Sequence, residues 1–118
     1  MAAIESYRDL LVSQRAIETS VAFYKMTASF PKDELFGLTS QMRRAGVSTA
    51  SNIADGYGRN SSGEYKHFLG IARGSNLELQ TRLLIATQLG FSTGEALAKV
   101  DSLSNEVSKM LNSLLAKL

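Results

Sequence analysis

The sequence contains no cysteine and no tryptophan, and only one proline and one histidine among 118 residues. Without cysteine the chain cannot form disulfides, thiolate zinc sites or iron–sulfur clusters, and it has no cysteine nucleophile. The single histidine, His67, excludes a metal site built from several histidines and leaves one candidate for a Ser-His-Asp triad. Serines on helices beside one histidine are a weak catalytic signal. We expect no enzyme, no metal, no cofactor and no small-molecule substrate.

Long hydrophobic runs and a strong charge are also absent. No apolar stretch approaches the roughly 18–20 residues of a membrane span, and the N-terminus lacks the basic start and apolar stretch of a signal peptide. Thirteen Lys and Arg against eleven Asp and Glu give a net charge of +2. Such a mildly basic chain permits a nucleic-acid partner without demanding one. We expect a cytoplasmic protein with no membrane association.

The pattern of apolar residues is helical throughout. No segment alternates apolar and polar residues for long enough to predict a strand. Apolar residues recur every three or four positions over about 9–29, 32–56, 62–89 and 93–118. Short connections make consecutive helices antiparallel neighbours. The sequence therefore predicts one all-α domain over residues 1–118, an antiparallel up-down-up-down four-helix bundle.

Local signals predict the helix ends and one core face. Glycine tolerates left-handed geometry, so residues 56–58 (GYG) predict the end of the second helix. Ser61 with Glu64, and Ser92 with Glu95, match the capping-box pattern and predict the starts of the third and fourth helices. The apolar face predicted for the first helix consists of Leu10, Ile17, Val21, Tyr24 and Ala28, with a second edge of Ala16, Phe23 and Phe30.

Glycines and polar residues interrupt the second and third helices. Glycine inside a helix costs roughly 0.5–1 kcal/mol relative to alanine, so Gly46, Gly70 and Gly74 indicate that another backbone or a ligand comes close. Polar side chains also recur at helical spacing on both helices, which predicts a polar network. Its members are Gln41, Arg44, Ser48, Asn52, Asp55, Ser75 and Glu78.

Two interpretations of the charged residues stay open. In the first, they are paired with one another inside the bundle or across a subunit interface, because buried charges persist only when paired. In the second, they form a ligand surface, because residues 41–82 hold six basic and three acidic residues, a local net charge of +3. The six basic residues are Arg43, Arg44, Arg59, Lys66, Arg73 and Arg82.

A basic surface of this kind predicts binding to the phosphates of RNA or DNA. Tyr57 and Tyr65 are available to stack on bases. Exposure of the side chains distinguishes the two interpretations. Arg59, next to the turn, is the basic residue that we most expect to be unpaired.

Three segments of the chain are distinctive: 38–45 (LTSQMRRA), 51–59 (SNIADGYGR) and 68–75 (FLGIARGS). They resemble the bacterial 23S rRNA intervening-sequence protein family, although Asp55 stands where glutamate is usual. The resemblance implies a four-helix bundle that assembles as a homopentamer with a central opening. The sequence also resembles the pentameric accessory protein of diversity-generating retroelements, which works with nucleic acid and a reverse transcriptase. The family's biochemical role is not established.

The expected function is a non-catalytic oligomer that binds nucleic acid through the basic surface of residues 41–82. The alternative is a structural or adaptor oligomer that binds a protein partner, with the same charges held in internal or intersubunit networks.

Overall fold

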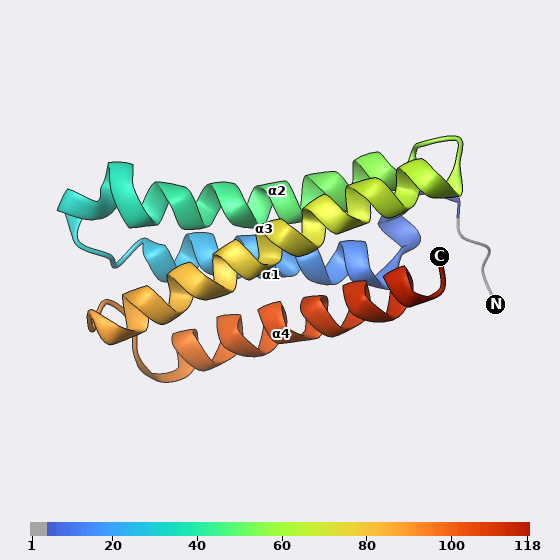
Figure 1. The fold of residues 1–118 in the computed structure, drawn as a ribbon. Helices are drawn as coiled ribbons and strands as arrows, with labels where there is room; N and C mark the ends of the chain where they lie inside the picture. Colours follow the sequence, from blue (N-terminus) through green and yellow to red (C-terminus); the bar gives the residue numbers. More distant parts are fainter. Residues whose placement is uncertain (1–4) are drawn as a thin grey trace.

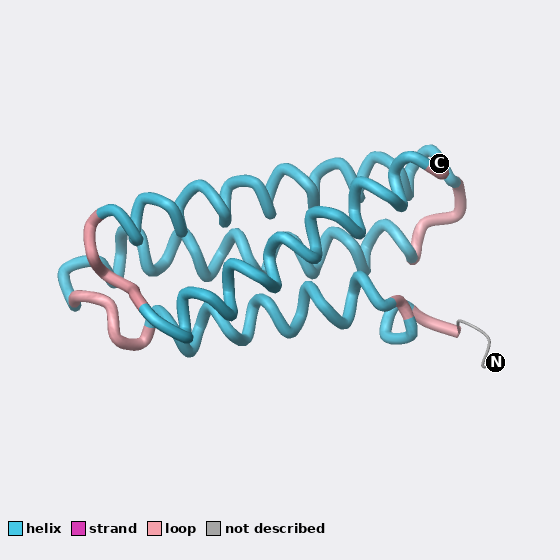
Figure 2. Tube along the Cα trace, turned by 90° about the horizontal axis from the view of Figure 1, so that it is seen from below, coloured by secondary structure: helices cyan, strands magenta, loops and turns pink. Residues whose placement is uncertain are grey.

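The computed structural model describes residues 5–118, which form four long helices: α1 (Leu11–Thr27), α2 (Ser40–Tyr57), α3 (Ser62–Gln88) and α4 (Gly94–Ala116). Consecutive helices run antiparallel, and α4 also packs against α1, so that the four enclose one core (Figure 1). The loops gather at the two ends of the bundle (Figure 2). The described residues contain no strand, which confirms the predicted all-α four-helix fold. None of the four helices is long and apolar enough to cross a membrane.

Short irregular helices lead into the first two long ones. A 3₁₀ turn over Tyr7–Asp9 precedes α1, and the Ser6 side chain caps it. Between α1 and α2 the chain forms a second 3₁₀ turn, Lys32–Glu34, and a π-helical turn, Leu35–Thr39. The single predicted helix over 32–56 is therefore broken near its start, because Gly37 adopts non-helical backbone angles.

The two predicted capping signals have different outcomes. The Ser61 hydroxyl accepts a hydrogen bond from the Glu64 backbone N–H at 3.1 Å, so α3 begins as predicted. The prediction for Ser92 and Glu95 is wrong. Thr93 is the residue before α4 and makes no side-chain cap, while Gly94 turns the chain with a φ of 73°. This start lies one residue later than the pattern requires, and Ser92 is buried instead.

The left-handed glycine predicted at the end of α2 is absent from residues 56–58, and glycine has another role there. The helix does end at Tyr57, but Gly58 has a φ of −76° and needs no left-handed freedom. Glycine is required at position 56, where a Cβ would lie 2.8 Å from the Cβ of Phe68 on α3. The two helices thus touch closely beside the turn that joins them. From there α3 diverges from α2 toward its other end (Figure 1).

The core consists of two apolar clusters with a polar layer between them. The cluster at the Phe30 end includes Phe23, Met42 and Leu79, and the other includes Ile53 and Leu69. On each helix one buried polar residue separates the two clusters. These four residues are Thr19, Thr49, Asn76 and Ser104, each at most 2% exposed. All three hydroxyls bond to carbonyls of their own helix, which satisfies their donors without a partner helix.

The prediction for α1 is right only for its second edge, because Ala16, Phe23 and Phe30 are buried whereas most of the main face is not. Ile17, Val21 and Tyr24 are each nearly half exposed. The α1 side chains that are buried are Val12, Ser13, Ala16, Thr19, Ala22, Phe23, Met26 and Thr27. Burial of the threonines costs little, because each hydroxyl donates to the carbonyl four residues earlier. Polarity is therefore a poor guide to burial on α1, and Ile17, Val21 and Tyr24 form an apolar stripe on its exposed face.

Candidate functional site

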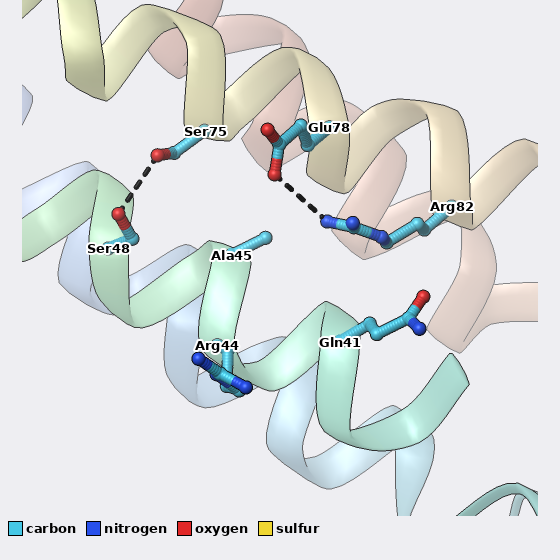
Figure 3. Close-up of a pocket in the computed structure, with 7 residues that line it drawn as sticks. All are labelled: Gln41, Arg44, Ala45, Ser48, Ser75, Glu78 and Arg82. Atoms are coloured by element: carbon cyan, nitrogen blue, oxygen red, sulfur yellow. Dashed lines mark hydrogen bonds and ion pairs between the residues drawn. The ribbon is translucent and has the colours of Figure 1, made fainter. Parts of the chain in front are cut away.

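The divergence of α2 and α3 opens a polar hollow between them, which we call the α2–α3 groove. It has a volume of about 370 Å³, and both helices contribute side chains to it (Figure 3). The residues that line it are Gln41, Arg44, Ala45, Ser48, Ser75, Glu78 and Arg82. All except Ala45 were predicted for the polar network or, in the case of Arg82, for the basic surface.

One end of the groove is marked by a hydrogen bond between the two helices. The Ser48 and Ser75 hydroxyl oxygens are 2.9 Å apart and join α2 to α3. Asn52, one turn nearer the closed end, donates to the Ser48 carbonyl at 2.8 Å. On the open side, Gln41 and Arg82 come from opposite walls (Figure 3). Small residues near the closed end and long polar ones near the open end thus give the groove its shape.

The predicted network exists only in part. Hydrogen bonds join Ser48, Asn52 and Ser75. Gln41, Arg44 and Glu78 line the same groove, but within residues 5–118 no hydrogen bond joins these three to one another. Asp55 lies outside the groove lining and pairs with Arg59 at 3.1 Å. The seven residues therefore do not form one connected network.

Each acidic partner in this region lies four residues before its base in the chain. Glu78 pairs with Arg82, one turn along α3, at 3.1 Å. Asp55 and Arg59 are also four residues apart. Exposed pairs of this kind contribute about 0–1 kcal/mol. Within residues 5–118 these charges are therefore not paired between helices in the interior. Pairing across a subunit interface, the other half of our first interpretation, stays a prediction.

Two of the six predicted basic residues are held by aromatic rings. Arg43 lies on the α1 side of α2, donates to the Thr27 hydroxyl at 2.9 Å and covers the Tyr24 ring at 4.7 Å. Arg59, besides its pair with Asp55, lies 4.4 Å from the ring centre of Phe68. The expectation that Arg59 is unpaired is wrong.

The other basic residues do not share one surface. Arg44, Lys66 and Arg73 are exposed, and within the described chain none of them has an ion-pair partner. Arg73 aligns on α3 with Gln80, two turns on, whose amide donates to Asn105 of α4 at 2.9 Å. It therefore points away from the groove. Of the six, only Arg44 and Arg82 line the groove.

The two tyrosines predicted to stack on bases pack on each other instead. The rings of Tyr57 and Tyr65 meet edge to face, with centres 6.2 Å apart. Burial, and to a smaller extent Tyr57, raise the pKa of the Tyr65 hydroxyl above its ordinary value of 10.0. No sequence signal identified Thr27 or Phe68 as partners of arginines. Thr27 lies on another helix than Arg43, and Phe68 lies on α3 whereas Arg59 lies in the turn before it. Within residues 5–118 no three acidic or histidine side chains are grouped as a metal site requires.

A family model described as 23S rRNA-intervening sequence protein matches residues 8–113. The chain belongs to this family. Among solved structures, this family member is similar to a protein of unknown function from the S23 ribosomal protein family of Bacteroides thetaiotaomicron. The TM-score is 0.79 at 23% identity, covering 89% of this chain and 98% of the other, so the likeness shows the fold alone. A comparison with curated proteins found no match.

Proposed function

We propose that this member of the 23S rRNA-intervening sequence protein family is a non-catalytic oligomer that binds the phosphate backbone of RNA or DNA. The observation that carries the proposal is the α2–α3 groove, where Arg44 and Arg82 line one polar hollow from two helices. Arg44 is exposed and unpaired within the described chain. Guanidinium groups bind phosphate oxygens with several N–H donors at once.

The outer surface supports assembly of several copies. Ile17, Val21 and Tyr24 are spaced by four and three residues and form an exposed apolar patch on α1. A second patch, on α3, includes Leu77 and Leu84, which lie two turns apart on one face and are each about half exposed.

Gly70 and Gly74 lie on the same helix as the second patch, and a Cβ on either would meet nothing within 4 Å. The close approach that their positions predict is therefore not made inside the chain. Two different apolar patches suit a head-to-tail contact, which closes into a ring when the rotation allows. A pentamer, as the family resemblance implies, would carry five times the +2 of one chain, or +10, and would attract phosphate accordingly.

Binding of oligonucleotides at two salt concentrations tests the proposal. Single-stranded RNA and DNA are titrated at roughly 50 and 200 mM salt, on protein sized by light scattering. The test variant, R44A/R82A, removes the two cations that line the groove. The control, K99A/K109A, removes two exposed lysines of the C-terminal part of the chain.

We expect particles larger than a monomer and binding that weakens steeply with salt. The test variant should lose most of this binding and the control should keep most of it. Equal losses of binding in the two variants would show that net charge, not the α2–α3 groove, attracts the nucleic acid. Oligomers that bind neither RNA nor DNA at low salt would overturn the proposal and favour the alternative, an adaptor for a protein partner.

A further inference from the structure

We propose that the α2–α3 groove is a phosphate-binding site in which Glu78 occupies Arg82 when no ligand is bound. The phosphate of a ligand then displaces this carboxylate from Arg82. That the phosphate belongs to a nucleic-acid backbone rests on the proposed function. The exchange itself rests on the geometry of the groove.

The groove offers many unused donors. A guanidinium has five N–H groups, and Arg82 uses one of them, donating to a Glu78 oxygen at 3.1 Å. Arg44, on the opposite wall, forms no ion pair or hydrogen bond with another described residue. The Gln41 amide and the bonded hydroxyls of Ser48 and Ser75 complete the lining. Two guanidiniums and several neutral donors in one lining are the groups that bind phosphate oxygens.

Glu78 is the only acidic residue of the lining and is easily displaced. Its side chain is 64% exposed, whereas that of Arg82 is 27% exposed. A carboxylate so exposed regains full hydration when it turns outward, and the exposed ion pair that it gives up is weak. Arg82 keeps its place in the groove wall and becomes free for the ligand. The groove then changes from two cations and one anion to two cations alone.

The shape of the groove suits a polymer better than an isolated ion. Its volume of about 370 Å³ far exceeds one phosphate group and reaches the lower range of small-molecule sites. A second hollow of about 420 Å³ shares Gln41, Glu78 and Arg82 and continues toward Leu38 and Ile85. Glu78 and Arg82 thus stand where the two hollows meet, at the point where a strand of linked phosphates would pass.

The Asp55–Arg59 pair provides a matched control. It also joins an acidic residue to an arginine four residues later, at the same distance of 3.1 Å, but outside the groove lining. E78Q and D55N each remove one negative charge and release one arginine. Four variants, E78Q, D55N, R44A and R82A, are titrated with two probes. Pyrophosphate binding is followed by NMR shifts of groove amides, and binding of a fluorescent single-stranded RNA is followed by anisotropy. Circular dichroism checks that each variant folds.

We expect E78Q to tighten pyrophosphate binding roughly three- to tenfold and D55N to change it less than about twofold. R44A and R82A should weaken it. Equal effects of E78Q and D55N, weaker binding in E78Q, or no binding of pyrophosphate to any folded variant would each overturn the proposal.

The RNA probe identifies the source of the phosphate. RNA binding that follows the same order of variants supports the groove as the backbone site. If the affinity for RNA is the same in all variants while the affinity for pyrophosphate changes as expected, the groove binds a phosphorylated small molecule. Pyrophosphate binding in the expected order with no RNA binding at low salt would support the groove and reject the proposed function.

Discussion

A Cβ on Gly56 would lie 2.8 Å from the Cβ of Phe68, because α2 and α3 meet most closely beside the turn that connects them. The same Cβ would also lie 3.3 Å from the Tyr65 carbonyl oxygen. Neither neighbour is the free end of a flexible side chain, so the helices would have to separate. Close contact here, with divergence farther along, is what opens the α2–α3 groove.

Replacing Gly56 by alanine should lower the free energy of unfolding by about 1–3 kcal/mol, the usual cost of forcing extra volume into a packed contact. Urea denaturation measures it. G58A is the control, because a Cβ on Gly58 would meet only the Asp55 and Ala54 carbonyl oxygens, at 3.5 and 3.8 Å. It should stay within about 0.5 kcal/mol of the parent. Equal stability of the two variants would contradict the contact with Phe68.

Replacing Arg43 by lysine should destabilise the protein by about 1 kcal/mol. The guanidinium donates from Nε to Thr27 while it covers the Tyr24 ring, and an ammonium group cannot reproduce this planar arrangement. R44K, at the next position, should leave thermal stability unchanged, because Arg44 is exposed and unpaired within the described chain. A smaller loss in R43K than in R44K would show that the bridge between α1 and α2 contributes nothing.

Replacing Asn76 by leucine should leave stability unchanged or raise it by about 1 kcal/mol. The Asn76 amide donates to the Ser104 carbonyl at 3.0 Å, but its own buried oxygen accepts no hydrogen bond from a described residue. A leucine of similar size removes this desolvated acceptor. N76A should instead lose about 2 kcal/mol or more, because it leaves a cavity between the two apolar clusters. A strongly destabilised N76L would show that the oxygen is satisfied in solution.

Stability should fall with rising pH once the pH exceeds about 10. Burial raises the pKa of Tyr65 above 10.0, so the folded state holds this proton more tightly than the unfolded state. Its contribution is fully present below pH 10.0 and is lost as the pH rises through the folded pKa. Y65F should remove this part of the slope in denaturation experiments between about pH 9 and 11. Y24F, which changes a half-exposed tyrosine, should keep it.

The sequence alone predicted the fold, because local rules govern most of it. Spacing of three and four residues placed the four helices, and short connections made them antiparallel. The core positions of α3, such as Leu69, Leu79 and Leu83, follow directly from this period. The prediction failed for the main face on α1, where Thr19 and Thr27 instead bury hydroxyls that bond to their own helix. A hydrophobic pattern cannot recognise polar groups that are satisfied locally.

The sequence also identified most residues that line the groove, since Gln41, Arg44, Ser48, Ser75, Glu78 and Arg82 follow helical spacing. It could not show which charges meet. Arg43 and Arg44 are neighbours in the chain, yet one packs on α1 and the other lines the groove, because adjacent helical residues point about 100° apart.

Helical periodicity and charge were therefore determined by the sequence itself, through interactions within a few residues. The tertiary structure alone decided the partners of Arg43 and Arg59 and the opening between α2 and α3. Those depend on the distance and angle between helices, which side-chain contacts such as Gly56 with Phe68 set only when the chain is packed.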